Sequence, residues 1–176
     1  SGSTGKPKSK DIKINYKIKT LNYRKYKWLL TYSPLRWAGI SMILHTISFN
    51  EKLIIPKNLE TQNLIRSMHQ VSAISLTPSL FKKILLFLGK KKFFNNIKQV
   101  TFGGEYVDQD TLNLAKKKFP YARLTSVYAL TEFGDICSCS DGKEGFPNKK
   151  FRKYEFKNKV LFINGKSTGD MWIKRN

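Results

Sequence analysis

The sequence has few of the residues on which several classes of protein depend. It contains two cysteines, Cys137 and Cys139, and two histidines, His45 and His69, among 176 residues. A single residue separates the cysteines, a spacing that strains a disulfide, and two thiols are too few for a closed zinc site. A disulfide framework and a His/Cys metal cluster are therefore disfavoured, and we expect a reduced, cytoplasmic compartment.

Long apolar runs and acidic residues are also scarce. No run approaches the roughly 20 apolar residues of a membrane span, so none is expected, and no signal peptide opens the chain. Lysine and arginine number 33 against 12 acidic residues, a formal charge of +21, and no acidic residue lies between Ile12 and Asn50. Such a charge can indicate nucleic acid or an acidic carrier surface. Because lysine dominates and the charges are spread along an Asn- and Ile-rich chain, biased codon usage explains them better, and nucleic acid is not the expected partner.

What the sequence does contain is enough apolar material for a folded core. Hydrophobic residues make up 40% and aromatic residues 13% of the chain, far above the level of a disordered chain. Short β-branched runs alternate with segments of helical periodicity. Strands are expected within 12–18, 53–56, 71–78, 97–105 and 123–132, and helices within 38–49, 59–70 and 79–88 and from Asp108 or Asp110 to Lys118.

This alternation predicts an α/β fold with a largely parallel sheet and flanking helices. After Ser140 the pattern changes to a loop at 141–150, a hairpin with its turn near Asn158, and a β-rich tail. The sequence is therefore divided into an α/β core over residues 1–140, to which the motifs described below belong except for the last, and an incomplete β-rich segment over 141–176.

The first eight residues, SGSTGKPK, combine glycine with small hydroxyl residues. Such a loop can direct backbone N–H groups at phosphate oxygens. A Walker-type loop requires two glycines with four residues between them, followed by Lys and Ser/Thr. Gly2 and Gly5 are separated by only two residues and Pro7 follows Lys6, so the Walker pattern fails. A plain Ser/Gly linker remains the alternative for this segment.

Three later segments add further groups, and the first two of them lie where predicted strands end. Gly103, Gly104 and Glu105 offer bare backbone that a flat base can approach closely. The segment from Tyr128 to Glu132 offers an aromatic ring, a hydroxyl and a carboxylate. The segment from Thr168 to Asp170 offers a carboxylate beside a tight turn, which suits a vicinal diol such as ribose. The order and spacing of the four segments together indicate a nucleotide site.

The four segments SGSTGKPK, FGGE, YALTEFGD and STGD, in this order, resemble the motifs of the adenylate-forming (AMP-binding) superfamily. That superfamily includes acyl-CoA synthetases, peptide-synthetase adenylation domains and beetle luciferases. The resemblance spans essentially the whole chain and implies a fragment of the larger adenylate-forming fold, truncated at both ends.

The resemblance also implies roles for individual residues. Ser3, Thr4, Gly5 and Lys8 would surround the β- and γ-phosphates, and Gly103, Gly104 and Glu105 would line the adenine pocket. Tyr128 would stack on adenine, and Asp170 would accept hydrogen bonds from the ribose. Thr131 would bond a phosphate and Glu132 would hold Mg²⁺, so that Lys8, Thr131 and Glu132 carry the catalytic roles.

The implied activity is that of an ATP- and Mg²⁺-dependent acid–thiol ligase. A small carboxylic acid would be activated as acyl-AMP and passed to the thiol of CoA or of a phosphopantetheine carrier protein. Positioning and electrostatics would supply the catalysis, because no protein nucleophile is needed. A non-catalytic remnant, whose basic surface binds an acidic carrier protein or nucleic acid, is the alternative.

Some features depart from the motif pattern. Ala129 stands where the superfamily usually has glycine, and its methyl group could crowd the nucleotide. Trp37 lies near a position often held by histidine in acyl-CoA synthetases, although a Trp among apolar neighbours is commonly plain core. The segment before the phosphate loop and the C-terminal lysine-bearing domain are missing, so we expect an ATP-binding core with little activity of its own.

Overall fold

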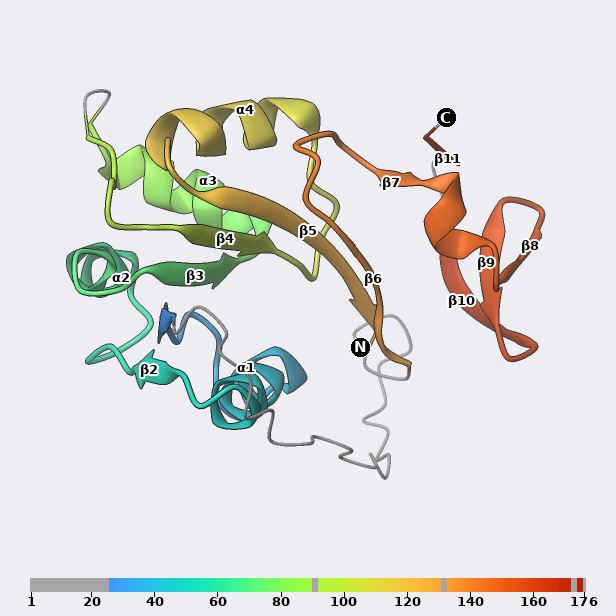
Figure 1. Ribbon diagram of the computed structural model, residues 1–176, viewed down its shortest axis with the longest axis horizontal. Helices are drawn as coiled ribbons and strands as arrows, with labels where there is room; N and C mark the ends of the chain where they lie inside the picture. Colours follow the sequence, from blue (N-terminus) through green and yellow to red (C-terminus); the bar gives the residue numbers. More distant parts are fainter. Residues whose placement is uncertain (1–25, 90–91, 131–132, 172–173, 176) are drawn as a thin grey trace.

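The computed structural model describes residues 26–89, 92–130, 133–171 and 174–175 (Figure 1). Its main body is a six-stranded sheet in the order β2-β1-β3-β4-β5-β6. Neighbouring strands are parallel, except for the antiparallel pair β5–β6. The α/β fold with a largely parallel sheet is therefore confirmed. The strands are β1 (Lys27–Leu29), β2 (Lys52–Ile54), β3 (Ala73–Leu76), β4 (Gln99–Phe102), β5 (Arg123–Leu130) and β6 (Gly134–Cys139).

Helices cover both faces of this sheet. Of the described helices, three pack on one face and one packs on the other. The described helices are α1 (Trp37–Ser48), α2 (Thr61–Met68), α3 (Pro78–Phe87) and α4 (Gln109–Lys118). Leu29 of β1 and Ile74 of β3 belong to the buried cluster that contains residues of α2, α3 and α4. Trp28 and Ala73, their neighbours in sequence, belong to a smaller cluster with Met42 of α1. The period of two along each strand thus divides the core into two layers.

Two helices begin at residues whose side chains cap them. Thr77 Oγ1 accepts a hydrogen bond from the Leu80 backbone N–H (3.1 Å) and precedes Pro78, a residue favoured in the first turn. Asp108 Oδ1 accepts from the Thr111 N–H (2.6 Å). Of the two aspartates at which the sequence predicted that this helix could begin, Asp108 is therefore the one that caps it.

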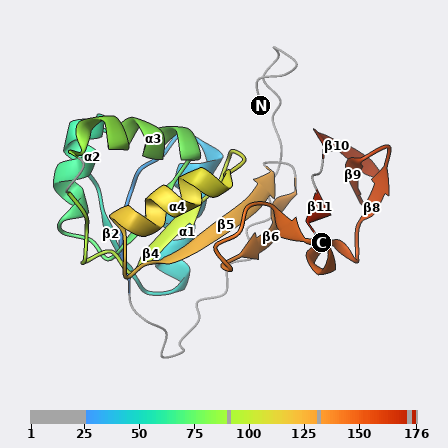
Figure 2. The ribbon, with the colours of Figure 1, turned by 90° about the horizontal axis from the view of Figure 1, so that it is seen from above.

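The rest of the chain folds into small β elements beyond the end of β5 and β6 (Figure 2). Strands β8, β9 and β10 form an antiparallel sheet, and β7 pairs with β11 in parallel. The predicted hairpin turn is confirmed, since Asn158 and Lys159 between β8 and β9 have φ of 49° and 66°. The elements are β7 (Phe146–Pro147), a 3-10 turn (Asn148–Phe151), β8 (Glu155–Lys157), β9 (Val160–Ile163), β10 (Lys166–Met171) and β11 (Lys174–Arg175).

Two local features differ from the sequence-based expectation. Strand β6 was not predicted, and it carries Cys137 and Cys139 as free thiols. The tight turn expected at Gly169 is instead an irregularity within β10: the register with β9 shifts between Ser167 and Met171, and Gly169 has φ of 77°. A β-bulge re-aims the side chain that follows it. The strand expected at 12–18 lies outside the described residues.

His45 and His69 are packed against aromatic rings. The His45 ring lies 5.4 Å from that of Trp28 and 4.6 Å from that of Phe49. Burial lowers the pKa of His45, opposed by the nearby Glu51 carboxylate. The His69 ring lies 4.9 Å from that of Phe94. Both histidines thus have structural contacts, and Trp37 is half-buried at the start of α1.

Candidate functional site

A pocket of about 430 Å³ lies where β4 and β5 end. This is the edge at which parallel α/β sheets commonly bind ligands, and the volume lies within the range of small-molecule sites. Segments far apart in sequence contribute to it. The lining residues are Phe102, Gly104, Glu105, Tyr106, Val107, Ser126, Val127, Tyr128, Ala129, Leu130, Gly145, Phe146, Leu161 and Asp170.

Of the two glycines after β4, Gly104 lines this pocket and Gly103 does not. The Gly103 N–H donates to the Leu76 carbonyl (3.2 Å), which continues the β3–β4 ladder by one residue. Gly104 lines the pocket with φ of 79°, a conformation that residues with a Cβ rarely adopt. Its exposed backbone therefore forms a wall without a side chain, as the sequence predicted for an approaching base.

Glu105 completes this wall and also contacts a helix. Its Oε2 accepts a hydrogen bond from the Ser79 N–H (2.9 Å) in the first turn of α3. A carboxylate is favourable at a helix N-terminus, where backbone N–H groups lack intrahelical partners. Glu105 thus fixes the segment after β4 against α3.

Tyr128 and Asp170 form the contact that joins the main sheet to β10. The Tyr128 hydroxyl donates to Asp170 Oδ2 at 2.6 Å. The Tyr128 ring is half-buried, and its centre lies 6.4 Å from that of Phe146. Burial, together with the Asp170 carboxylate, raises the pKa of Tyr128 well above its usual range. The hydroxyl therefore stays protonated and keeps donating to Asp170 at neutral pH.

The remaining predicted site residues lie outside the described part of the chain. These are Ser3, Thr4, Gly5 and Lys8 of the expected phosphate loop, and Thr131 and Glu132 after β5. Among the residues that the structure describes, no group of three or more His, Cys, Asp and Glu side chains could hold a metal ion. The predicted magnesium ligand, Glu132, is outside that search.

The structure adds pocket residues that the sequence motifs did not identify. Tyr106 and Val107 extend the wall that begins at Gly104, and Gly145 and Phe146 approach from the loop after β6. Gly145 has φ of 68°, so the short GFP run could have marked a turn. Ala129 lines the pocket too, so its methyl group lies where the sequence placed a possible crowding effect.

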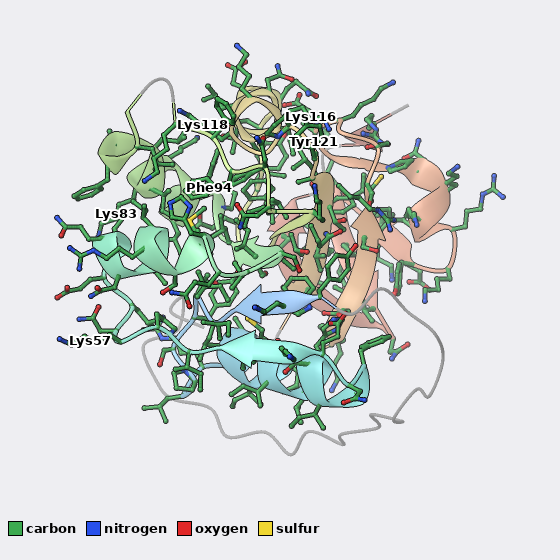
Figure 3. All side chains as sticks on the ribbon, turned by 60° about the vertical axis from the view of Figure 1, so that its left-hand side comes forward. Lys57, Lys83, Phe94, Lys116, Lys118 and Tyr121 are labelled. Atoms are coloured by element: carbon green, nitrogen blue, oxygen red, sulfur yellow. The ribbon has the colours of Figure 1, made fainter. Side chains whose placement is uncertain are left out.

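The carboxylates of Glu105 and Asp170 line the pocket. The face away from it, turned forward in Figure 3, presents Lys83, Lys116 and Lys118. Within the described ranges, no helix has the combination of length and hydropathy that a bilayer crossing demands.

The site combines groups that suit a nucleoside. It offers a side-chain-free glycine wall and a half-buried tyrosine ring for a flat base, and an aspartate for a diol. These groups come from the segment after β4, from β5 and from β10, and they meet at a single pocket. Four residues predicted separately from sequence, Gly104, Glu105, Tyr128 and Asp170, are thereby brought together.

No protein-family model and no curated protein sequence matches the chain. Solved structures do match it, with TM-scores of 0.55 to 0.59 in the three examples that follow. The luciferase-like enzyme of the mealworm Zophobas morio is 12% identical (TM-score 0.57), over 65% of this chain and 28% of that one. The O-succinylbenzoate coenzyme A synthetase of Bacillus subtilis, in complex with ATP and magnesium ion, is 17% identical (TM-score 0.55), over 65% and 24%. The E. coli MenE with bound OSB-AMS is 18% identical (TM-score 0.59), over 78% and 29%.

These likenesses establish the fold. The described chain shares its α/β fold with one part of each of these solved structures, which agrees with the fold that the resemblance implied. It spans about a quarter of the length of the solved structures that it matches.

Proposed function

We propose that this chain forms the nucleotide-binding part of an ATP-dependent acid–thiol ligase. The complete enzyme would activate a small carboxylic acid as acyl-AMP and transfer the acyl group to the thiol of CoA or of a carrier protein. The observation that carries the proposal is the meeting of Gly104, Glu105, Tyr128 and Asp170 at a single pocket. The resemblance of the four motifs predicts nucleotide-binding roles for the same four residues.

Each pocket group has a distinct task in this proposal. The bare backbone of Gly104 and the ring of Tyr128 bind adenine, because a flat base stacks on an aromatic face. Asp170 accepts from the ribose hydroxyls. The Tyr128 hydroxyl donates to Oδ2 of Asp170, so Tyr128 does not compete for the other carboxylate oxygen, Oδ1.

The chemical step is the attack of the substrate carboxylate on the α-phosphorus of ATP. The new bond is the acyl–phosphate bond, and the bond to pyrophosphate breaks. Ser3, Thr4, Gly5 and Lys8 are proposed to hold the phosphates, with Thr131 bonding one of them and Glu132 as the Mg²⁺ ligand. The chemistry that Mg²⁺ supplies when bound is compensation of phosphate charge.

Calorimetric titration with AMP, Mg-ATP and a stable acyl-AMP analogue tests the proposal. We expect Tyr128→Ala to weaken AMP binding by about tenfold or more, because base stacking contributes about 1–3 kcal/mol. Asp170→Asn should weaken it by about tenfold through the loss of a charge-assisted hydrogen bond. The matched control is Tyr121→Ala, which removes a tyrosine that is 65% exposed and does not line the pocket.

Two outcomes would contradict the proposal. The first is a folded wild-type protein that binds none of the three ligands. The second is a Tyr121→Ala variant that loses as much affinity as Tyr128→Ala. Steeply salt-dependent retention on RNA, DNA or an acidic carrier protein without nucleotide affinity would instead favour the non-catalytic basic surface.

A further inference from the structure

The loop between β6 and β7 is attached to the start of α4 by two residues that exchange hydrogen bonds. The Gln109 N–H donates to Glu144 Oε2 (2.9 Å), and the Glu144 N–H donates to Gln109 Oε1 (3.1 Å). Gln109 Nε2 also donates to the Gly142 carbonyl (2.9 Å). Figure 1 shows this loop passing the N-terminal end of α4. Residues 35 positions apart in sequence are thereby joined reciprocally.

Arg175 holds the same loop from its other side. Its Nη1 donates to the Glu144 carbonyl (3.2 Å), and both terminal guanidinium nitrogens donate to the Asp141 carboxylate. Glu144 is thus held through its N–H by Gln109 and through its carbonyl by Arg175. Because both backbone groups of one residue are bonded, its orientation is fixed, and so is the direction in which the chain leaves it.

The residues that follow Glu144 reach the pocket directly. Gly145 and Phe146 form one wall, while Tyr106 and Val107 form another just before α4. Gln109 begins α4 only two residues after Val107. The bonded pair therefore joins two pocket walls that belong to separate parts of the chain, at a point adjacent to both.

We propose that Gln109 and Glu144 are positioning residues. They set the distance between the wall formed by Tyr106 and Val107 and the wall formed by Gly145 and Phe146. The space between these walls, here called the base slot, thereby becomes selective for adenine. This inference rests on the proposed nucleotide function. A slot of fixed width accepts one flat ring system in one orientation, so the polar edges of the base meet fixed partners. If the loop is released from α4, the wall at Phe146 can move and the pocket no longer discriminates between bases. The ribose and the phosphates would still be bound, because other segments of the chain contact them.

The test compares affinities for AMP, GMP and CMP in matched variants. Gln109→Ala and Glu144→Ala should each weaken AMP binding by about tenfold, the expected effect of losing a paired hydrogen bond, while GMP and CMP change little. Glu144→Gln keeps an acceptor oxygen and should stay within about threefold of wild type. The controls are Gln62→Ala and Glu155→Ala, which remove exposed side chains of α2 and β8.

Three results would overturn the inference. Equal losses for all three nucleotides would show a merely structural effect. Unchanged AMP affinity in both alanine variants would show that the pair positions nothing. Loss in Glu144→Gln as large as in Glu144→Ala would show that charge, rather than the hydrogen bond, matters.

Amide hydrogen exchange in the ligand-free protein separates this inference from the proposed function. The Glu144 N–H should be protected in the wild type and should exchange faster in Gln109→Ala, with the β3 and β4 amides unchanged. If the Glu144 amide of the wild type is unprotected, the inference that Gln109 and Glu144 position the loop is wrong, even if AMP binds. If the amide is protected but the protein binds no nucleotide, the proposed function is wrong, and the inferred selectivity for adenine is wrong with it.

Discussion

The parallel-sheet body and the C-terminal β segment are built on very different amounts of buried apolar surface. The body has one cluster that runs from β1 to β5 beneath α2, α3 and α4, and it contains four fully buried phenylalanines. The segment packs around Ile136, Phe151, Leu161 and Ile163. Yet Phe146, Leu161 and Asp170, which line the pocket, come from this smaller unit. The pocket thus depends in part on the region with the smaller buried core.

The largest effect on stability is expected from a cavity in the core of the parallel-sheet body. Phe81→Ala should lower the free energy of unfolding by about 3–5 kcal/mol, the usual cost of a buried phenylalanine. The Phe81 ring lies 5.6 Å from that of Phe102 and 5.9 Å from that of Phe119, so its loss opens a cavity between helix and sheet. Urea unfolding measures the change. Phe87→Ala in the same helix, where the ring is 53% exposed, should cost under about 0.5 kcal/mol. Similar losses in the two variants would contradict this account.

A cavity in the core of the C-terminal β segment should destabilise that segment alone. Leu161→Ala removes a fully buried side chain of β9 and should cost about 2–3 kcal/mol. We expect amide exchange to accelerate in β8, β9 and β10 while β3 and β4 stay protected, because few apolar contacts connect the two cores. AMP affinity should fall as Asp170 loses its support. Leu114→Ala on α4, which is 41% exposed, serves as the control. Uniform acceleration across the protein would show that the two regions unfold as one.

A smaller effect is expected at the helix cap of the body. Asp108→Ala should cost about 1 kcal/mol, because the cap of α4 and the 2.9 Å ion pair with Lys82 are both lost. Hydrogen bonds from Thr111 and Lys82 lower the pKa of Asp108 to about 2. Its contribution is therefore complete above about pH 4, the unfolded value, and is lost as the pH falls through about 2. Urea unfolding of wild type and variant from pH 6 to pH 2 should converge at the acid end. Asp110→Ala provides the comparison, and a constant difference across this range would contradict the prediction.

The smallest effect is expected at the ion pair that secures the loop of the C-terminal segment. Although burial opposes its ionisation, hydrogen bonds from Arg175 and Cys139 lower the pKa of Asp141 to about 2. The side chains of Arg175 and Asp141 are 20% and 39% exposed, so solvent screens the pair. Arg175→Gln should cost at most about 1 kcal/mol, and less at high salt. Thermal unfolding at low and high ionic strength measures this. A larger, salt-independent loss would mean that Arg175 stabilises the segment by packing.

The helices could be predicted because their signals are local. The helix expected within 79–88 rests on apolar residues at helical spacing, such as Leu80 and Ile84, within one short segment, and α3 begins at Pro78, which the sequence had placed at the end of the preceding strand. Strand β6 was missed because GDICSC is short and polar, and its pairing with β5 depends on a connection that reverses the chain. The four-motif resemblance assigned Tyr128 and Asp170 to one nucleotide site, but neither the hydrogen bond between them nor the bulge in β10 was predicted. The Gln109–Glu144 pair has no local pattern at all, since exposed polar residues far apart in sequence carry no periodicity.

The strand order has a consequence for how the chain assembles during synthesis. After β1, β2 adds to one side, and β3, β4, β5 and β6 add in turn to the other. Each of these described strands therefore meets an edge already formed when it leaves the ribosome, and among them none has to be inserted between two that are paired. Parallel pairing is slow because its contacts are distant in sequence, and addition at a waiting edge shortens the time that each apolar strand spends without a neighbour. Translation itself can thus set the order of assembly.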